Sequence, residues 1–182
     1  WVCLDVCVDG RGTGSRGEMF KKLTYRHLGV LESEDQVAVA KQLQQIPYID
    51  GANIGMWGWS YGGYNTLMSV SAPSNASSAI KAGVAIAPVT DWRFYDTIYG
   101  ERYMNMPQQN PDGYKVSSAI NRIGNLNVNI LIIHGTADDN VHVQNTMEYL
   151  TASIANNKDV DLFLFPDKDH SIAGVNDRTY LY

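Results

Sequence analysis

The chain has 182 residues, of which 45% are hydrophobic and 18% are charged, and its formal net charge is −5. This length and composition are typical of one globular domain, and the acidic balance argues against nucleic acid as a partner. No apolar run approaches the ~20 residues that a membrane-spanning helix needs.

Short apolar runs alternate with helical patterns along the chain. We expect strands at residues 1–9, 53–57, 81–89, 129–135 and 160–166, because each is a short run rich in apolar side chains. Helical patterns cover residues 64–70 and about 145–154, and an aromatic, polar insertion occupies residues 91 to about 114. Strands that alternate with helices predict an α/β fold with a mostly parallel, doubly wound sheet covered on both faces.

A further helix is expected before the second strand. Residues 33–36, Ser-Glu-Asp-Gln, match a capping box. Val37, Ala40 and Leu43 then repeat on one helical face. Pro47 would end this helix, because proline lacks the N–H that continues the hydrogen-bond ladder.

The first predicted strand carries both cysteines, Cys3 and Cys7. Their Cα atoms would lie about 13 Å apart along a strand, too far for a disulfide, so we expect two small buried side chains. Residues 12–17 then match the G-x-G-x-x-G pattern of dinucleotide-binding folds. That motif also needs a helix at this point and a second strand ending in an acid about 20 residues on, and the sequence has neither. We therefore expect a turn-rich connection and no cofactor.

Residues 58–62, Gly-Trp-Ser-Tyr-Gly, match the G-x-S-x-G nucleophile elbow, a tight turn from a strand into a helix. Such a turn holds Ser60 out of the sheet, where a base can take the proton of its hydroxyl. Gly58, Gly62 and Gly63 would let the backbone pack closely where a Cβ would clash. The N–H of Tyr61 would lie at a helix N-terminus, where it can stabilise an oxyanion.

A base and an orienting acid are expected after later strands, because sites in such sheets form beyond the carboxyl ends of the strands. Asp138 follows the strand at 129–135, and His170 follows the strand at 160–166. The order serine, aspartate, histidine is the one that accompanies this elbow. Asp139 competes with Asp138, which we favour because the first residue beyond the turn has the shorter reach to the base.

The other three histidines fit the role of the base less well. His27 precedes the elbow in a polar stretch, and His142 is too close in sequence to Asp138 to reach Ser60 easily. His134 lies within a strand, so we expect a hydrogen-bonded imidazole in the core.

Several segments together resemble the catalytic domain of the dipeptidyl peptidase IV group in the prolyl oligopeptidase family of serine peptidases. They are residues 9–14 (Asp-Gly-Arg-Gly-Thr-Gly), 58–64 (Gly-Trp-Ser-Tyr-Gly-Gly-Tyr) and 134–142 (His-Gly-Thr-Ala-Asp-Asp-Asn-Val-His). Residues 87–89, 92, 95–96 and 99–103 extend the likeness over nearly the whole chain. The resemblance implies an α/β-hydrolase domain, carried together with a β-propeller.

The resemblance also implies a reaction, which is cleavage after proline or alanine near a free N-terminus, without a cofactor or metal. Ser60 would be the nucleophile, His170 the base and Asp138 the residue that orients it. Asn140 would bind the carbonyl of the residue before the proline. Aromatic walls suit a flat pyrrolidine ring, and the implied proline pocket is lined by Tyr61, Val89, Trp92, Tyr95, Tyr99 and Val141.

Two parts of the family's site are expected outside these 182 residues. The acidic pair that grips the substrate's amino group belongs to the propeller, and a tyrosine that completes the oxyanion hole precedes residue 1. We therefore expect residues 1–182 to be part of an α/β-hydrolase domain that is truncated at both ends, with its first strands before residue 1 and its final helix only starting near Tyr182. On that expectation the 182 residues alone would be a poor enzyme.

Alternatives stay open at this point. Residues 107–114 also resemble bacterial prolyl tripeptidyl peptidases, so tripeptide release is one alternative. An acylaminoacyl peptidase or esterase on the same fold is another, and an inactive binding module is a third. The expected partners are proline-containing peptides, the β-propeller and, as a homodimer, a second copy. The resemblance favours a periplasmic, extracellular or membrane-attached location, and residues 75–77, Asn-Ala-Ser, fit the glycosylation acceptor pattern.

Overall fold

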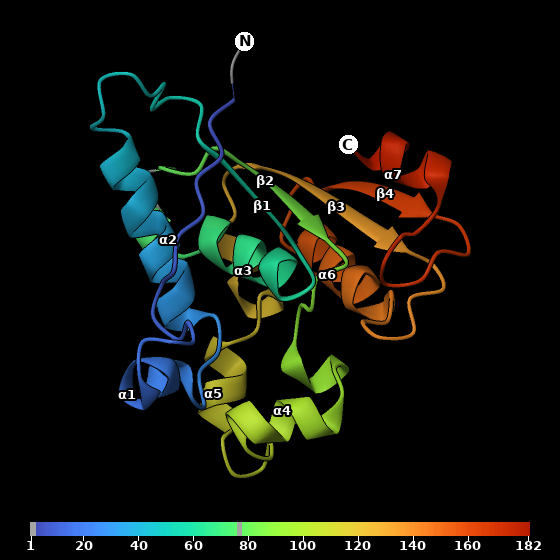
Figure 1. Cartoon of the computed structure of the whole chain (residues 1–182). Helices are drawn as coiled ribbons and strands as arrows, with labels where there is room; N and C mark the ends of the chain where they lie inside the picture. Colours follow the sequence, from blue (N-terminus) through green and yellow to red (C-terminus); the bar gives the residue numbers. More distant parts are fainter. Residues whose placement is uncertain (1–2, 76–77) are drawn as a thin grey trace.

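Four parallel strands form the centre of the molecule (Figure 1). The computed structural model describes residues 3–75 and 78–182. The described strands lie in the order β1-β2-β3-β4, and each pairs in parallel with the next along the chain. The predicted α/β fold is therefore confirmed, with strands at β1 (Gly55–Trp59), β2 (Ala82–Ile86), β3 (Asn129–Gly135) and β4 (Asp161–Phe165).

Side chains alternate between the two faces of the sheet, as the pleat requires. Ala85 and Ile132 are paired neighbours that belong to the larger hydrophobic core. Ile86 and Ile133, one residue further along, are paired neighbours in a second, smaller core on the other face. Burial on both faces explains why the strands are almost continuously apolar in the sequence.

Helices pack on both faces of the sheet. α3 (Tyr61–Val70) packs against β1 and β2, and α2 (Val30–Leu43) packs against α3. α6 (Gln144–Ala155) adds Tyr149 to the same larger core, whereas α7 (Val175–Leu181) adds Leu181 to the smaller one. The other helices are α1 (Glu18–Lys21), α4 (Thr97–Met104) and α5 (Pro111–Val116), with 3₁₀ turns at Lys22–Thr24, Pro73–Asn75, Trp92–Phe94 and Ile120–Asn125.

α2 begins three residues before the predicted capping box, so that prediction is wrong. Gly29 at the helix start has a φ of 75°, a left-handed conformation that favours glycine. A Cβ there would also collide with the hydroxyl of Tyr64. Ser33 therefore lies inside the helix, where its hydroxyl donates to Val30 O at 2.8 Å. The helix ends at Leu43, before Pro47 as predicted.

Residues 3–9 form no strand, so the strand predicted at residues 1–9 is wrong over its described part. Residues 1 and 2 lie outside the described residues. A strand needs a neighbour for its backbone groups, and this segment pairs with none of the four described strands. The predicted burial of Cys3 and Cys7 is also wrong, because both are exposed. Turns do follow at residues 11–16, which confirms the turn-rich connection.

The insertion after β2 folds as three short helical segments. Each begins with a side chain that accepts a backbone N–H: Asp91 before residue 92, Asp96 before α4, and Asn110 before α5. Such caps satisfy donors that have no partner within the helix. Figure 1 shows α4 and α5 next to each other, below the sheet in this view.

The glycosylation pattern at residues 75–77 is described only at Asn75. Its buried amide donates to Val70 O at 3.2 Å and to Ile80 O at 3.3 Å. Ala76 and Ser77 lie outside the described residues. An amide nitrogen with two buried acceptors is not accessible to a glycan, so the conformation described here argues against modification.

Candidate active site

Ser60 lies in the tight turn between β1 and α3, as the elbow motif predicts. Its φ of 58° and ψ of −115° are rare for a residue with a side chain. The Ser60 N–H donates to Ile86 O at 2.8 Å, which joins the turn to the end of β2. Strain of this kind gathers at functional sites, where the surrounding structure holds it in place.

The turn depends on two of the three glycines that flank it. A Cβ on Gly58 would collide with the backbone of Gly62, and a Cβ on Gly63 would lie 2.8 Å from Ile86 O. A Cβ on Gly62 would meet nothing within 4 Å, because it would point into open space. The predicted need for close packing therefore holds for Gly58 and Gly63 and is wrong for Gly62.

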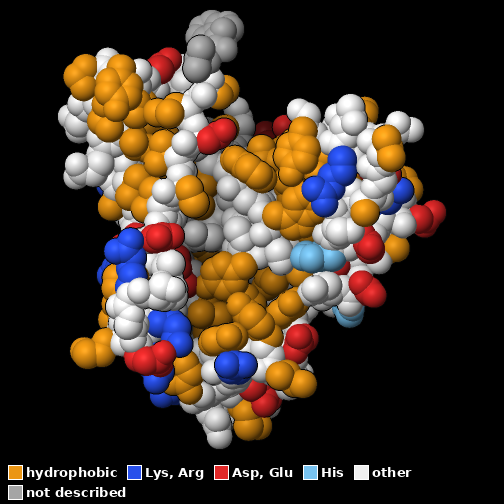
Figure 2. Space-filling view, in the orientation of Figure 1, with side chains coloured by type: hydrophobic (Ala, Val, Ile, Leu, Met, Phe, Trp, Pro, Cys, Tyr) orange, Lys and Arg blue, Asp and Glu red, His pale blue; other side chains and the backbone are white. Residues whose placement is uncertain are grey.

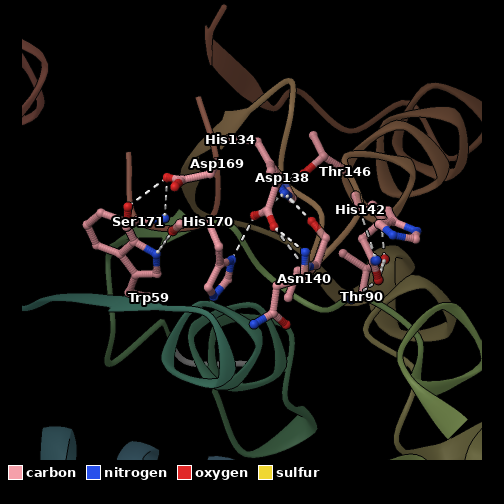
Figure 3. A network of polar contacts seen from close by, with 12 residues as sticks. Trp59, Thr90, His134, Asp138, Asn140, His142, Thr146, Asp169, His170 and Ser171 are labelled. Atoms are coloured by element: carbon pink, nitrogen blue, oxygen red, sulfur yellow. Dashed lines mark hydrogen bonds and ion pairs between the residues drawn. The ribbon is translucent and has the colours of Figure 1, made fainter. Parts of the chain in front are cut away.

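The structure brings His170 and Asp138 together. His170 Nδ1 lies 2.7 Å from Asp138 Oδ2, although the two residues follow different strands (Figure 3). The other carboxylate oxygen of Asp138 accepts from the N–H groups of Asn140 at 3.0 Å and Val141 at 2.9 Å. Burial opposes ionisation of Asp138, but the hydrogen bonds from His134 and His170 outweigh it and hold the pKa of this carboxyl well below its usual value.

His170 also lies beside the elbow. The indole N–H of Trp59, the residue before Ser60, donates to His170 O at 2.9 Å. Within the described residues, Ser60 Oγ makes no hydrogen bond to the His170 ring. Catalytic hydrogen bonds are often long without substrate and tighten when it binds. His170 and Asp138 therefore form a hydrogen-bonded pair, and His170 lies next to the turn that carries Ser60.

The other candidate residues, Asp139, His142 and His134, do not share the surroundings of the Asp138–His170 pair. Asp139 and His142 are exposed on the turn after β3, whereas Asp138 is buried. His134 is the core imidazole that its strand position predicts. Its Nε2 lies 2.8 Å from Val141 O and its Nδ1 lies 2.7 Å from the hydroxyl of Thr146.

Aromatic rings cluster beside the elbow. Trp92 stacks on Tyr99 with ring centroids 5.5 Å apart and planes 17° apart. Tyr61 lies 5.6 Å from Trp92, and Tyr95 lies 5.3 Å from Tyr99. Val89 and Val141, also predicted for the pocket, are buried against the same core. The aromatic side chains of the insertion thus pack with one another, as a flat apolar wall requires.

Asn140 faces this aromatic cluster. Tyr95 OH donates to Asn140 Oδ1 at 2.8 Å. The side-chain oxygen is thereby engaged, and the amide NH₂ group, which only donates, makes no hydrogen bond within the described residues. Asn140 is exposed, so a ligand can reach it.

Two cavities flank the site, and neither includes Ser60 in its lining. The larger, of about 440 Å³, is lined by Tyr61, Tyr99, Tyr103, Glu32 and Asn65 among others. Figure 2 shows a hollow in the middle of this face, with hydrophobic side chains on its floor and a histidine at its rim. Over the described ranges, no cluster of His, Cys, Asp and Glu has the makeup of a metal site.

Sequence reasoning missed three contacts at this site. They are the bond from Trp59 to His170 O, the approach of His134 to Asp138, and the bond from Tyr61 to Glu32. Only His134 carried a signal, because it lies four residues before Asp138 at the same strand end. The other two contacts join positions far apart in sequence, which no local spacing reveals.

The chain matches one protein family over nearly its whole length. The family model described as "Prolyl oligopeptidase family" matches residues 4–182. A "Probable dipeptidyl-aminopeptidase B" of Metarhizium robertsii is 45% identical over 97% of this chain and 20% of that protein. Its counterpart from Neurospora crassa is 48% identical over 94% of this chain and 18% of that protein. The chain thus spans about a fifth of the length of these curated relatives.

The fold is also similar to a solved structure. The crystal structure of Porphyromonas gingivalis dipeptidyl peptidase 4 matches with a TM-score of 0.93 and 55% sequence identity. The match covers 97% of this chain and 25% of that one. Sequence and fold therefore point to the same group of proteins.

Proposed function

The chain belongs to the prolyl oligopeptidase family, and on that premise we propose that it is the catalytic part of a serine dipeptidyl peptidase. The proposed enzyme releases dipeptides from free N-termini by cutting after proline or alanine. Ser60 is the proposed nucleophile, His170 the base and Asp138 its orienting acid. The observation that carries the proposal is the 2.7 Å contact of His170 Nδ1 with buried Asp138, next to the strained turn at Ser60.

The chemistry follows from these positions. His170 Nε2 takes the Ser60 proton while Oγ bonds to the carbonyl carbon of the scissile peptide. The oxygen of the tetrahedral intermediate accepts a hydrogen bond from the Tyr61 N–H at the start of α3. The C–N bond then breaks, and the departing amine takes the proton from His170. Water, deprotonated by the same imidazole, then bonds to the acyl carbon, and His170 returns the proton to Ser60 Oγ as the ester bond breaks and the acid product leaves. Asp138 holds the ring and stabilises its positive charge in both halves.

The aromatic cluster supports specificity for proline. Half-buried Tyr95 and Tyr99 would offer flat apolar faces to a pyrrolidine ring, and they pack against buried Trp92. Tyr61, Val89 and Val141 belong to the same core. Asn140 is proposed to donate its amide N–H to the carbonyl of the preceding residue, since its oxygen already accepts from Tyr95. Pocket contacts that are equally strong in the bound substrate and in the transition state would increase the affinity for the substrate. Alignment of the scissile bond with Ser60 would increase the rate of the chemical step.

The family also suggests what lies around this domain. We propose that the chain works with a β-propeller domain that holds the substrate amino group, because its relatives are about five times longer. A homodimer and a periplasmic, extracellular or membrane-attached location belong to the same proposal. Across the described part of the chain, no helix has the length and apolar character to cross a bilayer.

A substrate panel on the full-length protein tests the proposal. We expect Gly-Pro amides with a free N-terminus to be cleaved fastest. The same amide with an acetylated N-terminus and an Ala-Ala-Pro amide should be cleaved much more slowly. A preference for the tripeptide would replace dipeptide by tripeptide release, and a preference for acetyl-alanine amides or short esters would replace the proposal by an acylaminoacyl peptidase or esterase. No turnover of any substrate by folded protein would favour a binding module.

A further inference from the structure

The side chain of Tyr61 is hydrogen-bonded to the carboxyl of Glu32. The Tyr61 hydroxyl donates to Glu32 Oε1 at 2.7 Å, across 29 residues of sequence. Glu32 lies in the first turn of α2, whereas Tyr61 is the first residue of α3. This hydrogen bond therefore links a helix that carries no predicted site residue to the turn that carries the nucleophile.

The Glu32 carboxyl is only partly satisfied by hydrogen bonds within the described residues. Glu32 Oε2 and Asn65 Oδ1 are buried and have no hydrogen-bond partner among the described residues. Both residues line the cavity of about 440 Å³, whose wall also contains Tyr61. Burial raises the pKa of the Glu32 carboxyl, and the hydrogen bond from Tyr61 acts against that rise. Within this cavity the phenol of Tyr61 is the donor that the carboxyl engages.

The Tyr61 ring also contacts two neighbouring aromatic rings. It packs edge-on against Tyr64 at 5.4 Å and tilted against Trp92 at 5.6 Å. Those contacts limit the plane of the ring but tolerate sliding, because aromatic pairs have broad geometry. A hydrogen bond at the far end of the ring fixes the remaining direction. The Tyr64 hydroxyl, by contrast, is bound to Leu28 O and Ser117 O, so it does not compete for Glu32.

We propose that Glu32 is a positioning residue, which holds the Tyr61 ring as a wall of the proline pocket and so steadies the Tyr61 backbone N–H. The inference rests on the proposed function, since it assigns Tyr61 to the pocket and the oxyanion site. Glu32 itself touches no reacting atom. Its effect is transmitted through one hydrogen bond to Tyr61, whose ring lines the proposed pocket and whose backbone N–H is the proposed oxyanion donor.

A double-mutant cycle in the full-length protein tests the inference. Tyr61→Phe removes the hydroxyl, Glu32→Ala removes the acceptor, and Glu32→Gln keeps an acceptor oxygen. We expect Tyr61→Phe and Glu32→Ala each to lower kcat/KM for a Gly-Pro amide about tenfold, the loss that follows from one hydrogen bond to a charged group. Glu32→Gln should retain most activity, and the double variant should be no worse than either single one. Losses that multiply in the double variant would overturn the inference.

Glu34→Gln is the matched control. Glu34 lies on the same helix, is exposed and pairs with Arg11 at 3.3 Å. We expect this variant to keep the parent kcat/KM, which separates a local effect at Tyr61 from a general effect of charge on α2. A loss equal to that of Glu32→Ala would show that the acidic charge of α2 matters rather than the bond to Tyr61.

A second readout does not depend on turnover. With 3-fluorotyrosine incorporated at position 61, the parent should give one narrow ¹⁹F resonance, and Glu32→Ala should broaden or split it. An unchanged resonance would overturn the inference even if the enzyme is a peptidase. A changed resonance in a protein that cleaves no substrate would leave the positioning intact and refute the proposed function instead. If Glu32→Ala fails to fold, Tyr61→Phe and Glu32→Gln are compared for activity instead. The ¹⁹F measurement is then made on Glu32→Leu in place of Glu32→Ala.

Discussion

His134 Nε2 lies 3.3 Å from Asp138 Oδ2, the same oxygen that His170 Nδ1 contacts at 2.7 Å. The side chain of His134 is fully buried. Its Nε2 also donates to Val141 O, because a carbonyl can only accept. The imidazole thus ties the strand end to the turn that presents Asp138 (Figure 3).

We expect His134→Leu to lower kcat about 10- to 100-fold while leaving Ser60 and His170 in place. Leucine fills the volume but leaves Val141 O unpaired, which costs roughly 1–3 kcal/mol of folding free energy. Denaturant unfolding and steady-state kinetics measure the two effects. Thr146→Val, which removes only the partner of Nδ1, should have the smaller effect of the two. A kcat unchanged by His134→Leu would show that Asp138 holds its position without this ring.

Ser60→Ala and His170→Ala should each abolish turnover in the full-length protein. Members of a triad act as a unit, so either loss should lower kcat by about 10⁴-fold or more. Steady-state hydrolysis of a Gly-Pro amide measures it, with circular dichroism as the control for folding. Substantial activity in either variant would mean that the nucleophile or the base has been assigned to the wrong residue.

Tyr95 is the best single test of the pocket, because it is half-buried whereas Trp92 is a core residue. We expect Tyr95→Ala to lower kcat/KM for proline substrates. The loss should correspond to roughly 1–3 kcal/mol of transition-state stabilisation, the range for one pocket contact. Hydrolysis of a small unhindered ester should change much less. Tyr95→Phe keeps the ring and removes the bond to Asn140, so its loss isolates that contact. Equal losses on both substrates would indicate a folding defect and not a pocket.

The close packing of the elbow at Gly58 should make the stability of the protein sensitive to substitution there. Gly58→Ala should destabilise the protein by roughly 3 kcal/mol, since the added Cβ collides with backbone that cannot move aside. Gly62→Ala is the matched variant four residues on, where a Cβ meets open space. We expect its melting temperature to equal or exceed that of the parent, because alanine favours a helix over glycine. Similar melting temperatures for the two variants would contradict the close approach of residues 58 and 62.

The buried carboxyl of Glu32 should make the stability of the protein depend on pH. Burial raises the pKa of its carboxyl above the unfolded value of about 4.3. The folded state therefore favours the protonated form, and stability falls as the pH rises through the interval between the two pKa values. Glu32→Gln lacks this titration. Its unfolding midpoint should exceed that of the parent at pH 7, and the two should converge below about pH 4. A constant difference across pH would show that the carboxyl does not titrate differently in the folded state.

The sheet was the most predictable part of the fold. β3 has the predicted bounds, because an apolar run lies between a polar residue and a glycine. β1 was placed two residues too early, since pairing with β2 continues the strand through Gly58 and Trp59 to the serine. The start of α2 was missed because Gly29 and its contact with Tyr64 decide it, and a local capping pattern cannot report that contact.

The triad candidates could be chosen from the sequence because each follows a different strand at the same edge of a parallel sheet. Asp138 could be ranked above Asp139 because the first residue beyond the turn has the shorter reach to the base, and the contact with His170 agrees. The contacts that support the site, such as the bond between Tyr61 and Glu32, could not be predicted from the sequence. Glu32 and Tyr61 meet only because α2 and α3 pack together, and that packing depends on the whole core.

Labelling with a fluorophosphonate tests the central claim most directly, since this reagent bonds to a serine that a neighbouring base activates. The full-length protein would be labelled, digested and analysed by mass spectrometry, with Ser60→Ala treated in parallel. We expect one phosphonylated peptide, modified at Ser60, and no label in the variant. Folded protein that takes no label, or takes it at another residue in both samples, would contradict the assignment of Ser60 as the activated nucleophile.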